Sequence, residues 1–293
     1  MESVIVNRKY KDTLFAALFG RVEHKNEIID LYNVLNGTSY PHTAEIEIVT
    51  IENTVYLGMH NDAAFLIDNE TISLWEEQSS WNPNMPLRGL IYLAQEYRKL
   101  IGGNKYDIYG PAPIRIPTPK YVVFYIGPDN QPDRYLKLSD LFVDPSGGCV
   151  ELMTRIVNIN YRGNDSLLRA CKMLRDYTAL IRKVHNNKMA GMNINEAVDC
   201  AVQECINEDI LREYLLKHRE EATDMILTEY NEKEHLEHVA NYNKEQGIEQ
   251  GRREQNESNL NTLIHNLMKE DPSMPEDKAR KRALQLLGMQ RDH

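Results

Sequence analysis

Apolar and polar residues change their spacing along the first part of the chain. Residues 11–35 carry apolar side chains three or four positions apart, which predicts one or two amphipathic helices. From residue 45 to residue 80 apolar and polar residues alternate in short runs, which is typical of β-strands. Polar residues 68–70 lie between two of these apolar runs, so this part of the sequence predicts a β-hairpin.

Helical and extended patterns then follow each other before the helical pattern takes over. Residues 87–101 predict a helix that ends at two glycines, and residues 121–126 and 150–160 predict strands. From residue 164 onward the apolar residues are spaced as in helices. This order predicts an α/β or α+β core followed by a helical C-terminal region.

The end of the chain is more polar than the rest. The triplet Glu-Gln-Gly occurs at residues 245–247 and again at 249–251, and its two glycines predict a weak exposed helix or a linker. Helically spaced apolar residues at 260–268 and 283–287 predict a small helical appendage, although a flexible tail fits the pattern equally well. We therefore expect three parts: a core of residues 1–190, a helical extension of residues 191–240, and a polar linker with a small helical tail of residues 241–293.

The composition is that of an ordinary water-soluble protein. Of the 293 residues 42% are hydrophobic and 27% are charged, which excludes a disordered chain. The longest apolar runs are far shorter than the roughly 18 residues needed to span a bilayer, and the N-terminus lacks the apolar stretch of a secretion signal. The four cysteines show no spacing typical of a disulfide framework or a zinc site. These features predict a cytosolic globular protein.

The net charge of −10 argues against a protein that binds nucleic acid through bulk charge. Cationic residues are nevertheless concentrated between residues 155 and 188. A face that contacts a phosphate backbone and an ordinary solvated helix face both explain this concentration. The candidates for backbone contacts are Arg162, Arg169, Lys172 and Arg175.

The predicted hairpin places two acidic residues opposite each other. If its loop is centred on Asn69, residues whose numbers sum to 138 are paired, so Asp62 lies beside Glu76 with Cβ atoms about 5 Å apart. Gln78 points to the same side as Glu76. Two such carboxylates repel each other unless a cation lies between them, and Mg²⁺ prefers oxygen ligands and water. A shift of one residue would pair Asp62 with Glu77 instead and leave ordinary strand residues.

A metal ion between these carboxylates would lower the pKa of a bound water and stabilise charge on a phosphoryl oxygen. The pattern therefore indicates phosphodiester hydrolysis, with Asp62 and Glu76 as ligands and Gln78 beside the water.

These residues resemble the signature of PD-(D/E)XK nucleases, in the branch of Rpn-type recombination-promoting nucleases and transposases. The resemblance covers about residues 7–250 and includes the Glu-Gln-Gly repeat of the tail. It rests on ordered blocks: KYKDTLF at 9–15, LFG at 18–20, NDAAFLI at 61–67, LWEEQSS at 74–80, NPNMPLR at 82–88 and PTPKYVVFY at 117–125.

The resemblance implies a restriction-endonuclease-like core, with a mixed sheet flanked by helices, and cleavage of double-stranded DNA with Mg²⁺ or Mn²⁺. A homodimer would cut both strands. By position, Asp62 and Glu76 would be the metal ligands, and Gln78 would stand where the signature usually has lysine. Glutamine is neutral, so it can orient a water but cannot act as a cation or a base. The alternative is a catalytically inactive module of the same fold that binds nucleic acid or protein, with the acidic C-terminal region as its working part.

Four further residues are auxiliary candidates. Glu27 would add a third carboxylate from the first helical region, or is a surface charge. Arg88 and Tyr92 are four residues apart and share a helix face, where they would support the site, contact phosphate or pack. Lys120 begins a strand and would approach a phosphate.

Overall fold

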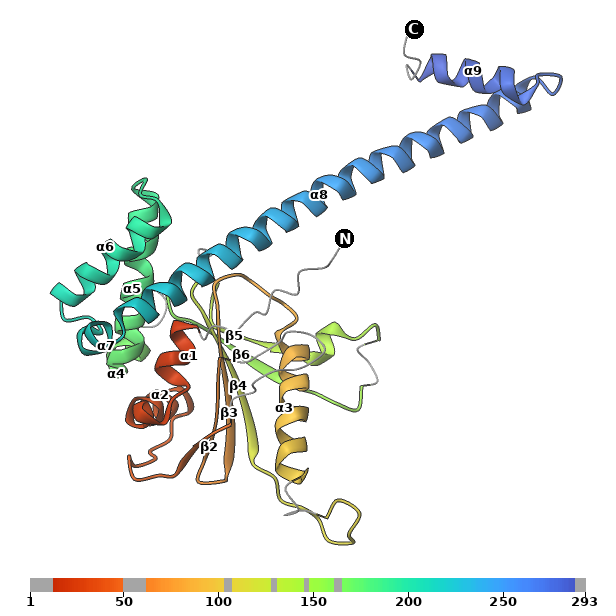
Figure 1. Cartoon of the computed structure of the whole chain (residues 1–293). Helices are drawn as coiled ribbons and strands as arrows, with labels where there is room; N and C mark the ends of the chain where they lie inside the picture. The colour runs from red at the N-terminus through yellow and green to blue at the C-terminus, as the bar shows by residue number, and fades with distance from the viewer. Residues whose placement is uncertain are drawn as a thin grey trace, which may run out of the picture. The chain divides into compact units, whose positions relative to one another are not determined.

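The computed structural model of the chain describes residues 13–49, 62–102, 107–127, 131–144, 148–160 and 165–287. These residues form an α/β fold in which helices flank a six-stranded mixed sheet, and the C-terminal region is helical (Figure 1). The predicted fold class is therefore confirmed. The chain divides into two compact units, Met1–Glu229 and Tyr230–His293, which are described separately below.

The sheet combines antiparallel edges with a parallel centre. Its strands follow the order β1-β2-β3-β4-β6-β5, and β3, β4 and β6 run parallel to one another. The carboxyl ends of these three strands meet at one edge of the sheet, which is where open α/β sheets bind ligands. The strands are β1 (Ile46–Ile48), β2 (Ala63–Ile67), β3 (Thr71–Gln78), β4 (Thr118–Tyr125), β5 (Arg134–Lys137) and β6 (Met153–Asn158).

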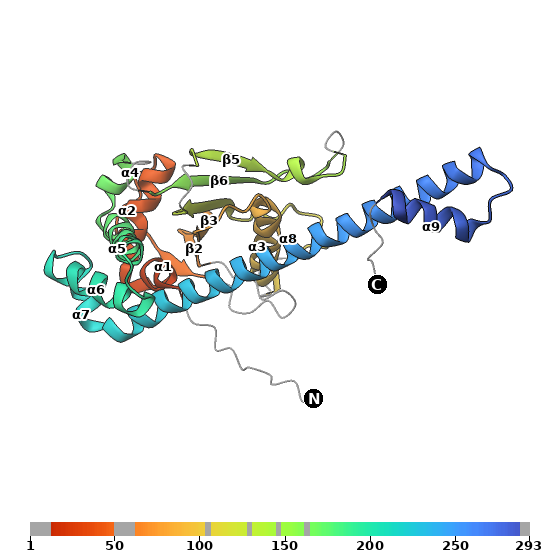
Figure 2. The ribbon, with the colours of Figure 1, turned by 90° about the horizontal axis from the view of Figure 1, so that it is seen from above.

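Helices pack on both faces of the sheet in the first unit. Figure 1 shows α1 (Leu14–Phe19) and α2 (Lys25–Asn36) on one side and α3 (Met85–Gly102) on the other. Figures 1 and 2 both show α2, α4 and α5 next to one another. The remaining helices of this unit are η1 (Val22–His24), η2 (Leu138–Leu141), α4 (Asp165–Ala170), α5 (Lys172–Met189), α6 (Ile194–Asn207), α7 (Arg212–Lys217) and the start of α8 (Arg219–Glu270).

Alternating residues of the central strands supply the two cores. On the side of α1, Trp75 of β3 lies between Phe65 and Phe124, with ring centroids 4.7 and 5.6 Å away, and Phe19 of α1 contacts it at 6.0 Å. On the side of α3, Tyr92 packs with Leu74, Tyr121 and Val123. Because side chains alternate along a strand, β3 sends its even-numbered residues to α3 and its odd-numbered residues to α1.

The structure refines the sequence-based expectation at two places in the helical region. The helix expected from residue 164 is divided into α4 and α5 at Cys171, whose backbone is extended (φ −119°, ψ 103°). For the repeat at 245–251, expected to be a weak exposed helix or a linker, the structure has the helical alternative, inside the single helix α8. Glutamate, glutamine, lysine and arginine favour helix, which offsets the roughly 1 kcal/mol cost of each glycine. Part of the stretch expected to form strands, residues 50–61, lies outside the described residues.

The second unit contains a hairpin of two helices with a core of its own. The C-terminal part of α8 packs against α9 (Glu276–Leu286). Small Ala279 and Ala283 of α9 are fully buried, which lets the two helices approach closely. Their partners on α8 are Leu260, Ile264 and Leu267. Within the described residues, no helix combines the length and the apolar character needed to cross a bilayer.

Candidate active site

The pairing of β2 with β3 has the register that the sequence predicts. Ala63 lies opposite Trp75, and Ile67 lies opposite Thr71, so the numbers of paired residues sum to 138. Continuing this register by one residue places Asp62 opposite Glu76. The alternative register, shifted by one residue, is therefore excluded for the described strands.

The turn between the two strands explains this register. Asp68 and Asn69 have positive φ angles of 48° and 56°. Asparagine and aspartate tolerate this left-handed conformation better than other residues with a side chain. Asp68 Oδ1 also accepts a hydrogen bond from the backbone nitrogen of Glu45, at 2.7 Å, which ties the turn to the segment before β1.

The carboxylate of Glu76 is buried and is bound by three side chains. Its Oε2 accepts a hydrogen bond from the Tyr121 hydroxyl at 2.6 Å. Its Oε1 accepts one from Gln78 Nε2 at 2.9 Å and forms an ion pair with Arg88. Burial raises the pKa of Glu76 to about 7, an effect that the Arg88 charge opposes and the Asp62 charge reinforces.

The carboxylate of Asp62 is held from the other side, by α1 and by the backbone of β3. Its Oδ1 accepts a hydrogen bond from the Thr13 hydroxyl at 3.1 Å, and its Oδ2 accepts one from the backbone nitrogen of Glu77 at 2.6 Å. Burial raises the pKa of Asp62 to about 6, whereas these two hydrogen bonds and the Arg88 charge lower it. The hairpin thus brings together two carboxyl groups that both resist ionisation.

Helix α3 brings Arg88 and Tyr92 to this pair. Arg88 Nη2 donates a hydrogen bond to the Tyr92 hydroxyl at 2.9 Å, and the guanidinium lies 5.9 Å from the centre of the Tyr92 ring. The Tyr92 ring in turn meets the Tyr121 ring edge to face, with centroids 6.3 Å apart. Arg88, Tyr92, Tyr121, Gln78 and Glu76 therefore form one connected group.

The structure places Glu27 and Lys120 elsewhere. Glu27 lies near Cys171, just before α5, where burial raises the pKa of the thiol and the charge of Glu27 adds a smaller effect in the same direction. Lys120 is exposed in β4 opposite Ser73, three residues before the residue that pairs with Glu76, which corresponds to about 10 Å along the strand. Among the described residues, neither Glu27 nor Lys120 has an interaction with Asp62, Glu76 or Gln78.

Two of the four cationic residues proposed to contact DNA form ion pairs within the protein. Lys172 Nζ lies 2.5 Å from Oδ2 of the buried Asp176, and Arg175 Nε lies 3.6 Å from its Oδ1. Arg169 is exposed on α4, and Arg162 lies outside the described residues. Lys172 and Arg175 thus neutralise a buried carboxylate, which leaves less charge for a phosphate backbone.

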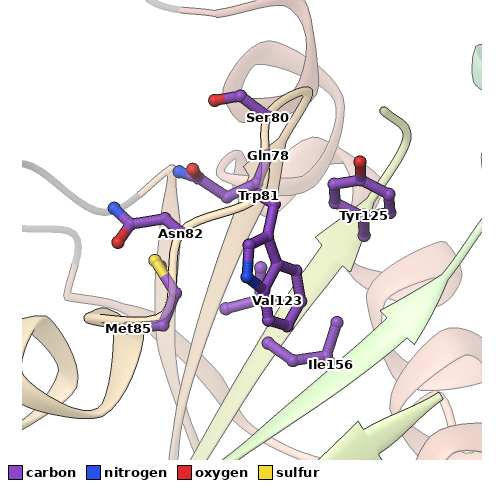
Figure 3. Close-up of a pocket in the computed structure, with 8 residues that line it drawn as sticks. All are labelled: Gln78, Ser80, Trp81, Asn82, Met85, Val123, Tyr125 and Ile156. Carbon is purple, nitrogen blue, oxygen red and sulfur yellow. The ribbon is translucent and has the colours of Figure 1, made fainter. Parts of the chain in front are cut away.

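A small hollow lies beside Gln78, at the carboxyl ends of the parallel strands (Figure 3). Figure 3 shows the Trp81 indole directed toward Val123 and Ile156. The guanidinium of Arg134 lies 4.6 Å from the centre of the Trp81 ring. The hollow is lined by Gln78, Ser80, Trp81, Asn82, Met85, Val123, Tyr125 and Ile156. Gln78 therefore stands between the Glu76 carboxylate and a mainly apolar surface.

Asp62 and Glu76 retain capacity to bind a divalent cation. An ionised carboxylate offers about four lone-pair positions. Donors take three of these positions in Glu76 and two in Asp62. No group of three or more His, Cys, Asp or Glu side chains suited to a metal occurs among the described residues, so an ion here would have two carboxylates as ligands. Mg²⁺ is commonly held by one or two carboxylates and completes its shell with water.

The sequence analysis missed two residues that hold the carboxylates. Tyr121 lies within a run of apolar strand residues, and its hydroxyl reaches Glu76 across 45 residues of sequence. Thr13 precedes α1 and contacts Asp62 across 49 residues. The spacing of residues carries no signal for either contact, because both depend on how helices pack on the sheet.

Comparisons of the chain with protein-family models, with curated proteins and with solved structures find no match. Membership of the nuclease family therefore stays a prediction that rests on the residues themselves.

Proposed function

We propose that the protein is a metal-dependent endonuclease that hydrolyses phosphodiester bonds of double-stranded DNA with Mg²⁺ or Mn²⁺. The observation that carries this proposal is the proximity of Asp62 and Glu76 at the end of the hairpin, where the Asp62 charge acts on Glu76 and Gln78 Nε2 donates a hydrogen bond to Glu76 Oε1. Burial disfavours the charge on both carboxylates. A cation between them would remove this cost, because it attracts both charges.

Each residue of the group has a role in this reaction. Asp62 and Glu76 would hold the metal, which supplies a bound water of lowered pKa and positive charge beside a phosphoryl oxygen. Gln78 donates to Glu76 through Nε2, so its Oε1 remains to accept a hydrogen bond from the attacking water. Tyr121 fixes the second oxygen of Glu76 and thereby the direction of its free lone pair.

The second candidate is an inactive module of the same fold that binds nucleic acid or protein. The ion pair between Arg88 and Glu76 favours it, because this pair already neutralises one carboxylate. A carboxylate whose charge is already neutralised by a protein side chain gains less from binding a metal ion.

The two candidates differ in a nicking assay with supercoiled plasmid. Wild-type protein should nick the plasmid with Mg²⁺ or Mn²⁺ and not with EDTA, and Asp62→Asn should reduce the rate at least 100-fold. Glu70→Gln is a matched control, since Glu70 is an exposed acidic residue in the turn of the same hairpin. Wild-type protein that binds the plasmid without nicking it would favour the inactive module. Equal nicking by wild type and Asp62→Asn would indicate a contaminating nuclease.

The proposal includes a homodimer, in which each copy cuts one strand. A dimer in sedimentation experiments, together with linear plasmid as an early product, would support it. A monomer that produces only nicked circles would contradict this part of the proposal alone.

A further inference from the structure

The guanidinium of Arg88 lies beside Glu76 and supplies the positive charge that Gln78 does not. Gln78 is neutral, and its amide shares the Oε1 atom of Glu76 with Arg88. Among the described residues, Arg88 is the cation whose charge acts on both Asp62 and Glu76. We infer that Arg88 binds the phosphate group that is cleaved, as a catalytic residue. This inference rests on the function proposed above.

Arg88 has hydrogen-bond donors left for such a ligand. A guanidinium carries five N–H donors. Nη2 contacts Glu76 and Tyr92, while the contact of Nη1 within the described part of the chain is a weak one with the Met85 sulfur, at 4.0 Å. Nε is buried and has no hydrogen-bond partner among the described residues. A buried ion pair stabilises a fold only if its remaining protons are also bound, so a purely structural role would leave these donors unexplained.

The side chain is also positioned before any ligand arrives. Tyr92 lies one helical turn after Arg88, accepts its hydrogen bond and places its ring under the guanidinium. Tyr92 is itself fully buried. The side chain of Arg88 nevertheless keeps 24% of its surface exposed, so an anion from solvent can reach it. Donors that are fixed in advance are the kind that stabilise charge in a transition state.

The charges of the group balance only when Arg88 is counted. Asp62 and Glu76 carry two negative charges, a divalent ion carries two positive charges, and a phosphodiester carries one negative charge. Arg88 neutralises this last charge. The same count predicts opposite effects of removing it: the phosphate would bind more weakly, whereas the metal would bind as tightly or more tightly because a neighbouring cation is gone.

The test compares Arg88→Gln, Arg88→Lys and Tyr92→Phe with Arg98→Gln, which changes an exposed arginine of the same helix. We expect Arg88→Gln to lower kcat about 100-fold while Mn²⁺ affinity, measured by calorimetry, is unchanged or higher. Arg88→Lys should restore part of the rate. Tyr92→Phe should give a smaller loss, and Arg98→Gln should behave as wild type.

A second measurement separates this inference from the proposed function. Binding of a duplex oligonucleotide is measured with Ca²⁺ at several salt concentrations. Arg88→Gln should weaken binding several-fold and lower the slope of log affinity against log salt by about one. If Asp62→Asn abolishes cleavage while Arg88→Gln changes neither kcat nor duplex binding, the inference is wrong and the proposed function stands. If no variant cleaves and wild type does not either, the binding arm alone decides the role of Arg88. Loss of Mn²⁺ binding and a lower melting temperature in both Arg88 variants would show a structural role instead.

Discussion

The hydroxyl of Thr13 donates a hydrogen bond to Asp62 Oδ1 at 3.1 Å and at the same time accepts one from the backbone nitrogen of Ala16 at 3.0 Å. Thr13 is thus the N-cap of α1 and also a hydrogen-bond donor to Asp62, the carboxylate proposed to bind the metal. This double role ties the orientation of Asp62 to the start of a helix that is otherwise buried.

Thr13→Val keeps the shape of the side chain and removes both hydrogen bonds. The pKa of Asp62 should then rise further, because a hydrogen bond to its charged form is lost. We expect the pH of half-maximal cleavage to move upward and the free energy of unfolding to fall by about 1–2 kcal/mol. Thr13→Ser retains the hydroxyl and should stay close to wild type. An unchanged pH profile in Thr13→Val would contradict the positioning role.

The two buried carboxylates should make the metal-free protein less stable at alkaline pH. Burial raises the pKa to about 6 for Asp62 and about 7 for Glu76, so the folded state binds these protons more tightly than the unfolded state. Their contribution to stability is full below about pH 4 and is lost as the pH rises through 6 and 7. In EDTA, Asp62→Asn should therefore be more stable than wild type at pH 8, by about 1–2 kcal/mol, and not at pH 4. Urea unfolding at both pH values checks the sign.

A divalent ion should reverse this destabilisation. At 100 times its dissociation constant, Mn²⁺ stabilises a folded protein that it binds by about 2.7 kcal/mol. We expect wild type to melt at a higher temperature with Mn²⁺ at pH 8 and to gain much less at pH 5, where protons compete for both carboxylates. Asp62→Asn should show no shift at either pH. An equal shift in wild type and Asp62→Asn would place the ion at another site.

The helical hairpin of the second unit should unfold without affecting the site of the first. Ala283 is fully buried between α8 and α9, so Ala283→Glu would bury a charge in a small core and cost several kcal/mol. Arg282→Glu changes the exposed neighbouring residue and serves as the control. We expect only Ala283→Glu to lose helical signal in circular dichroism and to become sensitive to protease. Mn²⁺ binding should be the same in both variants, since each unit has its own core.

Local rules were enough to predict the hairpin and the pairing within it. The two apolar runs, the polar residues between them and the left-handed turn at Asp68 and Asn69 are sufficient to give the observed register. Asp62, Glu76 and Gln78 meet for that reason alone. Strand β5 was missed because it has only four residues, and half of them are exposed.

The partners of the two carboxylates could not be predicted in the same way. Arg88 contacts Glu76 because of the position at which α3 packs on the sheet. This position depends on how the side chains of the core fit together, and the spacing of residues in the sequence does not reveal it. The cationic residues of α5 illustrate the same limit. Their charges were visible in the sequence, but the buried Asp176 that binds Lys172 and Arg175 could not be recognised as their partner.

Gly89 controls how closely α3 approaches Tyr121. A Cβ atom at Gly89 would lie 2.4 Å from Cδ1 of the Tyr121 ring, so Gly89→Ala must displace the ring or the helix. We expect the free energy of unfolding to fall by about 1–3 kcal/mol, despite the better helix propensity of alanine. Mn²⁺ should also bind more weakly, because the Tyr121 hydroxyl no longer holds Glu76 in place. Gly102 in the same helix has open space around it, so Gly102→Ala should be neutral or slightly stabilising. Thermal unfolding and Mn²⁺ calorimetry of the two variants check this prediction. If Gly89→Ala behaves like Gly102→Ala in both measurements, the packing of α3 against Tyr121 does not affect Mn²⁺ binding.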